Sequence, residues 1–223
     1  MDEVSAERME EPPVAPRKAS REARRLQLIE ATIDTLATEG YSRTTLTNVA
    51  ARAGLSHGLV IFHFQSKEGL LTETLLYLAE EYRQNWRRAV AAAGESPAAQ
   101  LSALIGADFL PEICNPVRLS AWCAFWGEAQ SRPIYQQKCG SNDLDYIHAL
   151  EDICARLVET GGYAGDASRI ARILRVTIEG VWLDLMIMNT PFDRQDGLKT
   201  VFTCAAAFFP AHFTEDGLAK PEG

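Results

Sequence analysis

Two groups of residues in this 223-residue chain could do chemistry, and both suit binding better than catalysis. The first lies in the stretch TTLTNVAARAGLSHGLVIFHFQSKEGL, residues 44–70. Four apolar residues there share one face of a short helix: Leu46, Val49, Ala50 and Ala53. Gly54 supplies a left-handed turn, and Ser56 can cap a second helix. This spacing predicts a helix-turn-helix whose second helix offers its first residues to the base edges of DNA.

We expect ten residues of this stretch to contact DNA: Thr44, Thr45, Ser56, His57, Gly58, Leu59, Ile61, Phe62, His63 and Lys67. The two threonines could bond a phosphate or could only cap a helix. Lys67 stands in the first turn of the next helix, where backbone N–H groups favour a phosphate, although it could be merely solvated. His63 could instead pack locally. The second helix is poor in Arg, Asn and Gln, so specificity would depend on thymine methyl groups and DNA shape.

The second group is aromatic and acidic. Trp122, Phe125 and Trp126 lie at i, i+3 and i+4, while Asp108 interrupts an otherwise apolar helical stripe. An aromatic face beside a carboxylate suits a quaternary ammonium ion. The predicted ligand-binding residues are Asp108, Trp122, Phe125, Trp126, Tyr135, Glu179 and Trp182, with Tyr146 as a further candidate wall. The alternative is that these aromatic residues are ordinary core packing and that Asp108 bonds a neighbouring backbone group.

The elements that must position these residues are all helical. The sequence predicts an all-α fold of about nine helices, and no alternating strand pattern is convincing. The first helix should end near Gly40. The others should span about 46–53, 57–63, 67–93, 97–114, 116–128, 133–161, 167–189 and 194–209. We expect a disordered tail at 1–18, a DNA-binding domain at 19–66, a ligand-sensing and dimerisation domain at 67–213, and a flexible tail at 214–223.

Charge is distributed unevenly along the chain, whose net charge is −8. Residues 17–67 carry eight Lys or Arg against four acidic residues, whereas the segments before and after them are acidic. A basic N-terminal module on an acidic body fits local attraction to phosphates, although ordinary scatter of charge would also explain it.

Several classes of protein are disfavoured. We expect no membrane span and no secretion signal, and the five cysteines lack metal-type pairing, which favours reduced thiols in the cytoplasm. No nucleophile elbow, Walker loop or zinc helix is present, so we expect neither an enzyme nor a cofactor. Cys139, His148 and Cys154 are spaced so that a helix would scatter them around its axis, which argues against a metal site.

The chain resembles the TetR family of transcriptional repressors. The resemblance rests on Thr44-Thr45, Val49-Ala50, Ala53-Gly54-Leu55-Ser56 and the run His63-Phe64-Gln65-Ser66-Lys67-Glu68-Gly69-Leu70, and it covers nearly everything after residue 20. Two further segments, residues 121–126 and 179–183, look like the BetI-type branch, whose named members respond to choline. The family often has tyrosines where this chain has Ile61 and Phe62, which removes two expected phosphate contacts.

This resemblance implies a homodimer on a near-palindromic operator, released when a small molecule moves the long fourth helix. The last two helices would form the dimer interface, and apolar faces there include Val181, Leu185 and Met188 with Val201, Ala205 and Phe208. These faces could instead pack within the subunit. Three alternatives stay open: a regulator that senses a neutral or hydrophobic ligand, a helical enzyme, and an adaptor that does not bind DNA.

Overall fold

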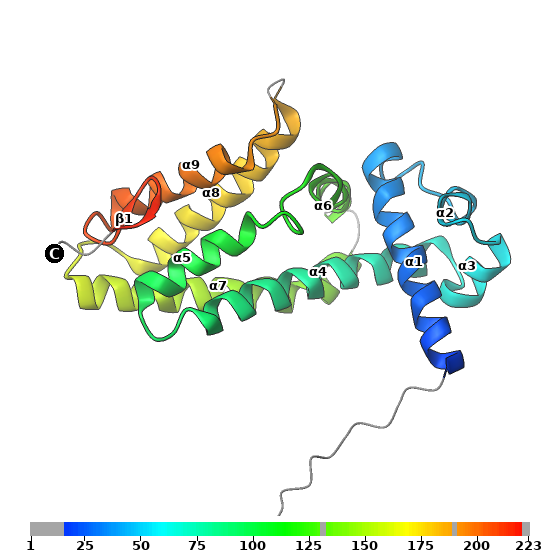
Figure 1. Ribbon diagram of the computed structural model, residues 1–223, viewed down its shortest axis with the longest axis horizontal. Coiled ribbons are helices and arrows are strands. Elements are labelled where there is room, and N and C mark those ends of the chain that lie inside the picture. Colours follow the sequence, from blue (N-terminus) through cyan, green and yellow to red (C-terminus); the bar gives the residue numbers. More distant parts are fainter. Residues whose placement is uncertain (1–15, 130–132, 189–190, 220–223) are drawn as a thin grey trace, which may run out of the picture.

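The computed structural model describes residues 16–129, 133–188 and 191–219, without the side chains of residues 16–19, 129 and 133–142. The described chain is almost entirely helical, as predicted (Figure 1). Its helices are α1 Pro16–Glu39, α2 Leu46–Ala53, α3 His57–Phe64, α4 Lys67–Ala92, α5 Pro97–Asp108, α6 Pro116–Ala129, α7 Pro133–Gly161, α8 Ala167–Ile187 and α9 Arg194–Phe208. None of these helices combines the length and the apolar character that crossing a membrane requires.

The helices are divided between two bodies that α4 connects (Figure 1). Helices α1, α2 and α3 gather around one end of α4, while α5 and α7 lie along the rest of its length. Helix α8 packs on α7, and α9 packs on α8 and α5. Helix α6 packs on α1 as well as on α7 and α8. The helix that carries the predicted aromatic face therefore contacts both bodies.

Local sequence signals account for the helix boundaries. Ser56, Ser66, Ser96 and Asp166 each accept a backbone N–H at the start of a helix, which satisfies one of its unpaired donors. Helix α5 ends at Asp108 rather than near residue 114, which corrects the prediction. Pro111 explains the early end, because proline has no N–H to donate and disfavours the helical conformation in the residue before it.

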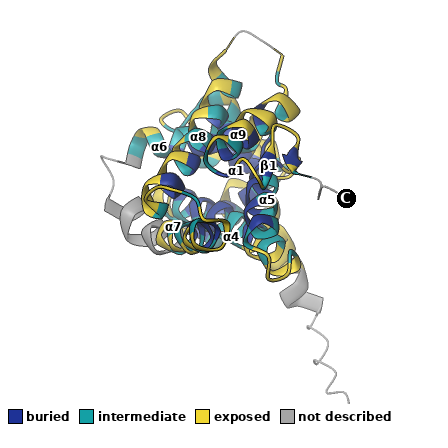
Figure 2. Cartoon of the chain, turned by 90° about the vertical axis from the view of Figure 1, so that its left-hand side faces the viewer, coloured by how far each residue is buried: buried dark blue, intermediate teal, exposed yellow. Residues whose placement is uncertain are grey.

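The buried apolar residues form two cores. Figure 2, an end-on view, shows buried residues on the faces that the helices turn towards one another. One core fills the body formed by α5, α7, α8 and α9. The other holds the three N-terminal helices against the start of α4 and also contains Ala121, Trp122 and Phe125 from α6. Because α6 contributes three buried residues to the core of the N-terminal module, a shift of α6 must disturb that module.

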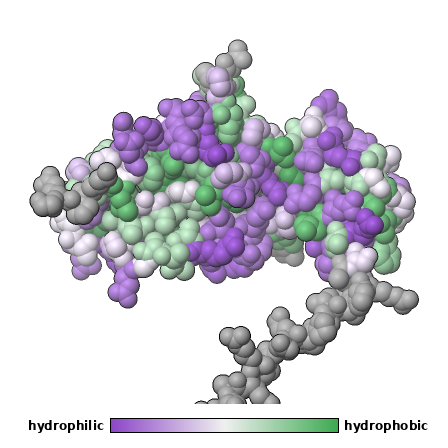
Figure 3. Space-filling model, in the orientation of Figure 1, coloured by the Kyte–Doolittle hydropathy of each residue, from purple (hydrophilic) through white to green (hydrophobic). Residues whose placement is uncertain are grey.

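The expected dimer faces are partly wrong. Val201 and Ala205 of α9 are fully buried within the subunit. A Cβ atom at Gly197 of α9 would lie 2.9 Å from Val181 Cγ1 and 3.3 Å from Leu185 Cδ1, so α8 and α9 pack closely there. The apolar residues that α8 leaves exposed follow a different stripe, at Ile173, Val176, Leu183 and Ile187. Figure 3 shows apolar surface reaching the tip where α8 meets α9.

The end of the chain is more ordered than the sequence suggested. Strands β1 (Phe213–Thr214) and β2 (Gly217–Leu218) pair antiparallel at 213–218, where we expected flexible chain from residue 214. Phe213 is 2% exposed and stacks on Phe202, with ring centroids 6.3 Å apart. Burial of this ring explains why the hairpin stays on the body.

The first turn of α4 contains a close approach that requires glycine. A Cβ atom at Gly69 would lie 2.3 Å from the carbonyl oxygen of Phe64, the last residue of α3. We predict that Gly69→Ala lowers the free energy of unfolding by about 2 kcal/mol, because backbone must move to admit the methyl group. Urea unfolding followed by circular dichroism would measure this change.

The matched control is Gly106→Ala in α5, where no heavy atom lies within 4 Å of the added carbon. It should be neutral or stabilising by up to about 1 kcal/mol, because alanine favours the helix. Equal unfolding curves for the two variants would contradict the close approach.

Candidate functional site

The turn between α2 and α3 has the geometry that the sequence predicted. The Thr45 hydroxyl accepts the Asn48 N–H at the start of α2, and Gly54 ends that helix with φ at 64°. Ser56 then caps α3 by accepting the Leu59 N–H at 3.3 Å. These contacts fix the start of α3, which is the part of a recognition helix that reaches base edges.

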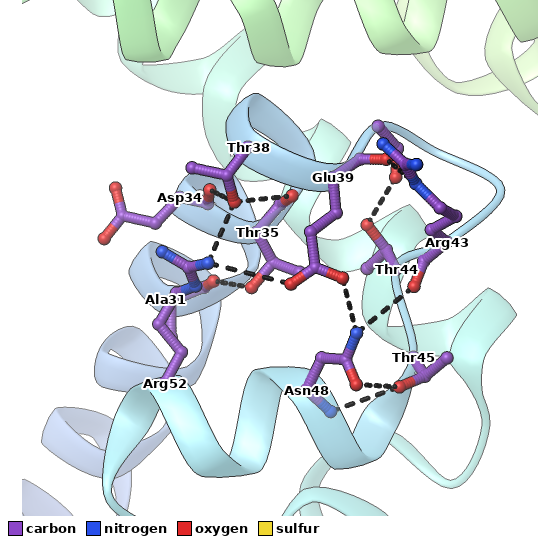
Figure 4. Close-up of polar contacts among 11 residues, drawn as sticks. Ala31, Asp34, Thr35, Thr38, Glu39, Arg43, Thr44, Thr45, Asn48 and Arg52 are labelled. Carbon is purple, nitrogen blue, oxygen red and sulfur yellow. Dashed lines mark hydrogen bonds and ion pairs between the residues drawn. The ribbon is translucent and has the colours of Figure 1, made fainter.

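Polar contacts hold α2 against the end of α1 (Figure 4). Asn48 donates through Nδ2 to Glu39 Oε2 at 2.5 Å, and Thr45 donates to Asn48 Oδ1 at 2.8 Å. Arg52 reaches both Glu39, at 3.7 Å, and the Thr38 hydroxyl, at 2.8 Å. These contacts therefore fix α2 in one position against α1.

Helix α3 presents a mostly uncharged outer surface. Val60 and Phe64 turn into the core, whereas His57, Gly58 and Ile61 are exposed. Phe62 is 63% exposed, and the Arg21 guanidinium lies 5.4 Å from its ring centroid. Of the other predicted contacts, Ser56 is exposed just before this helix, while Leu59 and His63 are half-buried. Such a surface can touch thymine methyl groups but has little capacity for bidentate base contacts.

Two of the predicted phosphate contacts are already used inside the protein. Thr44 is 1% exposed, and its hydroxyl donates to the carbonyl of Gly40 at 2.8 Å. This removes Thr44 from the predicted phosphate contacts, because a buried hydroxyl cannot reach DNA. Lys67 Nζ donates to the carbonyls of Tyr41 and Ser42, at 3.2 and 3.1 Å, so a phosphate would have to share or replace these partners.

A second site lies between α4, α6, α7 and α8, where an aromatic pocket encloses about 220 Å³. Four of the seven predicted ligand-binding residues line it: Trp122, Trp126, Glu179 and Trp182. The remaining lining residues are Tyr82, Asp143, Tyr146, Ile147, Arg175 and Ile178. The Trp182 Nε1–H is buried without a hydrogen-bond partner among the described residues.

The other three predicted residues are placed differently. Phe125 packs edge-on against Tyr41 with ring centroids 5.9 Å apart, so it faces the N-terminal module and not the pocket. Asp108 stands behind the pocket wall, where Tyr146 donates to its Oδ2 at 2.6 Å. Tyr135 lies in α7, but its side chain is outside the described part of the chain. The first two predictions are corrected because helical spacing does not fix how a helix is rotated.

Five lining residues were not found from the sequence: Tyr82, Asp143, Ile147, Arg175 and Ile178. Tyr82 precedes Trp86 by one turn of α4, so an aromatic pair on the long helix was a usable signal. The pair Arg175 and Glu179, one turn apart, reads as an ordinary exposed ion pair and carried no such signal. Their guanidinium and carboxylate meet at 2.5 Å beside the pocket.

Carboxyl groups surround the aromatic rings. Asp143 and Glu179 line the pocket, and burial raises the pKa of Asp143 above its usual range. Asp108 is fully buried, and this burial raises its pKa to about 7 even though hydrogen bonds from Tyr146 and Tyr82 favour its ionised form. Its Oδ1 has no hydrogen-bond partner among the described residues. A buried cation near the pocket would lower the cost of ionising these groups.

Helix α6 ties the pocket to the N-terminal module by charge as well as by packing. The Arg118 side chain is 14% exposed and pairs with Glu30 of α1 at 3.1 Å and Glu81 of α4 at 3.2 Å. It also lies 5.9 Å from the Tyr77 ring centroid, and Tyr77 in turn donates to Glu30 at 3.0 Å. One residue of α6 therefore binds both the first helix and the connecting helix.

Comparisons with known proteins match both parts of the chain. Residues 28–74 match the profile described as "Bacterial regulatory proteins, tetR family", and residues 97–210 match "BetI-type transcriptional repressor, C-terminal". The HTH-type transcriptional regulator BetI of Paraburkholderia xenovorans is 32% identical over 188 residues, covering 83% of this chain and 93% of the relative. BetI of Burkholderia thailandensis is 33% identical over 188 residues, covering 82% and 92%.

Solved structures share the fold. A putative transcriptional regulator from Pseudomonas aeruginosa PAO1 superposes with a TM-score of 0.72 at 28% identity, covering 85% of this chain and 91% of that one. A putative regulator from Saccharomonospora viridis, solved in complex with choline, superposes with a TM-score of 0.69 over 86% of this chain and 97% of that one. Its identity is 19%, so it shows likeness of fold alone.

The buried Asp108 makes stability depend on pH. Its pKa is about 7 in the folded protein against 3.8 for an ordinary aspartate, so the folded state holds a proton that the unfolded state releases. The free energy of unfolding should therefore fall as pH rises from about 4 to above 7, by up to about 4 kcal/mol. We predict that Asp108→Asn removes this loss and raises the melting temperature more at pH 8 than at pH 5.

Thermal unfolding at the two pH values would measure the effect. Asp34→Asn, exposed on α1, is the matched control and should leave the difference between the two melting temperatures unchanged. A native chain and an Asp108→Asn variant with parallel pH profiles would contradict the burial argument.

Proposed function

The chain belongs to the TetR family of transcriptional regulators and carries a BetI-type C-terminal domain, and from this premise we propose that it is a choline-responsive repressor. Its relatives are DNA-binding regulators and not enzymes. In the proposal, a homodimer binds a palindromic operator, and a choline-like quaternary amine in the aromatic pocket releases it.

The observation that carries this proposal is the composition of the pocket. Three indole rings, from Trp122, Trp126 and Trp182, share it with the carboxyl groups of Asp143 and Glu179. Ring faces and carboxylates both attract a quaternary ammonium ion, which cannot donate hydrogen bonds and is poorly served by other polar groups. The Saccharomonospora viridis regulator, solved with choline, supports the same ligand class.

Release of DNA is proposed to pass through α6. Trp122 and Trp126 of this helix line the pocket, while Phe125 and Arg118 contact the N-terminal module. A ligand that needs a different position of the two indoles would move α6, and with it α1 and the start of α4. A ligand shifts an equilibrium only through a difference in affinity for the two arrangements, so the indole contacts must differ between them.

The partner subunit is proposed to cover the exposed stripe of α8. Ile173, Val176, Leu183 and Ile187 lie on one face of the helix and are 37–66% exposed. Gly180 falls on the same face and would let two helices approach closely. A two-fold dimer through this face would set the separation of two α3 helices, which must be about 34 Å to serve successive major grooves.

DNA binding is proposed to use the outer surface of α3 and its flanking caps. His57 stands at the exposed start of α3, where it can donate to a base or a phosphate. We predict that His57→Ala weakens operator binding about tenfold, the loss expected for one specific contact. Fluorescence anisotropy with a labelled duplex from the region upstream of the gene would measure it.

His148→Ala, exposed on α7, is the matched control and should bind as the native chain does. Binding should also weaken steeply with added salt, because phosphate contacts release counterions. If the affinity for DNA depends neither on salt concentration nor on a palindromic sequence in the duplex, the proposed repressor function is wrong.

Ligand response is the second arm of the test. Choline should weaken operator binding of the native chain, and Glu179→Gln should require about fivefold more choline, because one pocket carboxylate is lost. The same anisotropy assay, titrated with choline, gives both values.

Glu159→Gln, exposed on α7 and outside the pocket, is the control and should respond like the native chain. If choline has no effect while neutral or hydrophobic compounds release the DNA, the cationic ligand is wrong and the regulator senses another class.

A further inference from the structure

A second, larger cavity adjoins the aromatic pocket. It encloses about 550 Å³ between α7 and the first half of α8, and it shares Ile147 and Arg175 with the pocket. Its charged lining residues are Glu151, Asp166, Arg169, Arg172 and Arg175. We refer to it as the arginine cleft. The shared residues make the cleft and the pocket neighbours on the two sides of Arg175.

The polarity of α8 changes along the face that lines both spaces. Ser168, Arg172, Arg175, Glu179 and Trp182 follow one another at intervals of four, three, four and three residues. This spacing keeps them on one side of a helix. The face is therefore basic in the arginine cleft, and acidic and aromatic in the pocket, with Arg175 and Glu179 at the boundary.

The three arginines of the cleft outnumber its two acidic residues, Glu151 and Asp166, and neither acidic residue forms an ion pair with them among the described residues. Asp166 Oδ1 accepts the Arg169 N–H as the cap of α8. Arg175 donates one Nη1 hydrogen to Glu179, but a guanidinium carries five N–H donors in all. Arg172 is exposed and forms no ion pair among the described residues. Donors suited to a carboxylate or a phosphate therefore remain in the cleft beside the aromatic pocket.

We propose that the effector is a zwitterion, with a quaternary ammonium group in the aromatic pocket and a carboxylate or phosphate in the arginine cleft, held by Arg175 and Arg172. This inference rests on the proposed cationic ligand and names its class more closely. A simple cation in the pocket meets repulsion from Arg175, whereas a zwitterion places a negative charge beside that residue. The Arg175 guanidinium then strengthens binding of the zwitterion, although it weakens binding of a simple cation.

The test compares three probes by isothermal titration calorimetry on the full chain: choline, phosphocholine and glycine betaine. Phosphocholine or glycine betaine should bind at least about tenfold more tightly than choline, as one charge-assisted contact predicts. Arg175→Gln should reverse the order. The substitution removes the guanidinium that would bind the anionic group. It also frees the Glu179 carboxylate from its ion pair, so choline should bind more tightly than it does to the native chain.

Arg172→Gln tests the cleft without disturbing the ion pair at its boundary. It should lower the ratio of zwitterion to choline affinity about threefold or more, whereas Arg88→Gln, an exposed arginine of α4 outside both spaces, should keep the native ratio. A structural effect of the substitutions would weaken all three probes together and would not reverse their order.

Each outcome decides the matter. If choline binds and neither zwitterion binds more tightly, the inference fails while the cationic ligand stands. If a zwitterion is preferred but both arginine variants keep that preference, the anion site lies elsewhere and the inference fails. If none of the three probes binds, the cationic ligand fails and the zwitterion fails with it.

Discussion

The structure depends most on the position of α6, which packs between the N-terminal module and the C-terminal body. Arg118 holds this position by charge: its guanidinium pairs with Glu30 of α1 and Glu81 of α4, and its side chain is only 14% exposed. Phe125 holds it by apolar packing, through its edge contact with Tyr41. Exposed ion pairs contribute little stability, and burial makes a pair costly to form. The value of this network is therefore that it fixes where α6 sits, more than that it stabilises the fold.

The position of α6 explains why the pocket and the DNA-binding module can share one helix. Trp122 lines the pocket and is also buried in the core of the N-terminal module, so the indole has neighbours on both sides. Packed cores deform little, so a ligand that needs a different spacing of Trp122 and Trp182 would move α6 as a whole. In the proposed mechanism, the resulting shift of α6 reaches α1 through Arg118 and Phe125, and the separation of the two recognition helices changes in the dimer.

Much of this architecture could be predicted from the sequence, because its signals are local. Ser56, Ser66 and Pro97 mark helix starts by capping chemistry that acts within a few residues. The rotation of each helix could not be predicted, and this is why Phe125 was assigned to the wrong surroundings. Thr44 lies in the connection between α1 and α2, whose fold buries its hydroxyl against Gly40, and helical spacing says nothing about such a turn. Arg118 was missed for another reason: its partners lie 88 and 37 residues away, and no periodicity connects them. The arginine cleft likewise exists only after α7 and α8 pack together.

The most direct test of the α6 mechanism is the affinity for choline with and without saturating operator DNA, measured by calorimetry in the native chain and in Arg118→Met. Coupling between two ligands is reciprocal, so an operator that choline displaces must weaken choline binding by the same factor. The mechanism predicts a clear weakening in the native chain and a ratio of the two dissociation constants close to one in Arg118→Met. An identical ratio in both proteins would contradict the role given to α6.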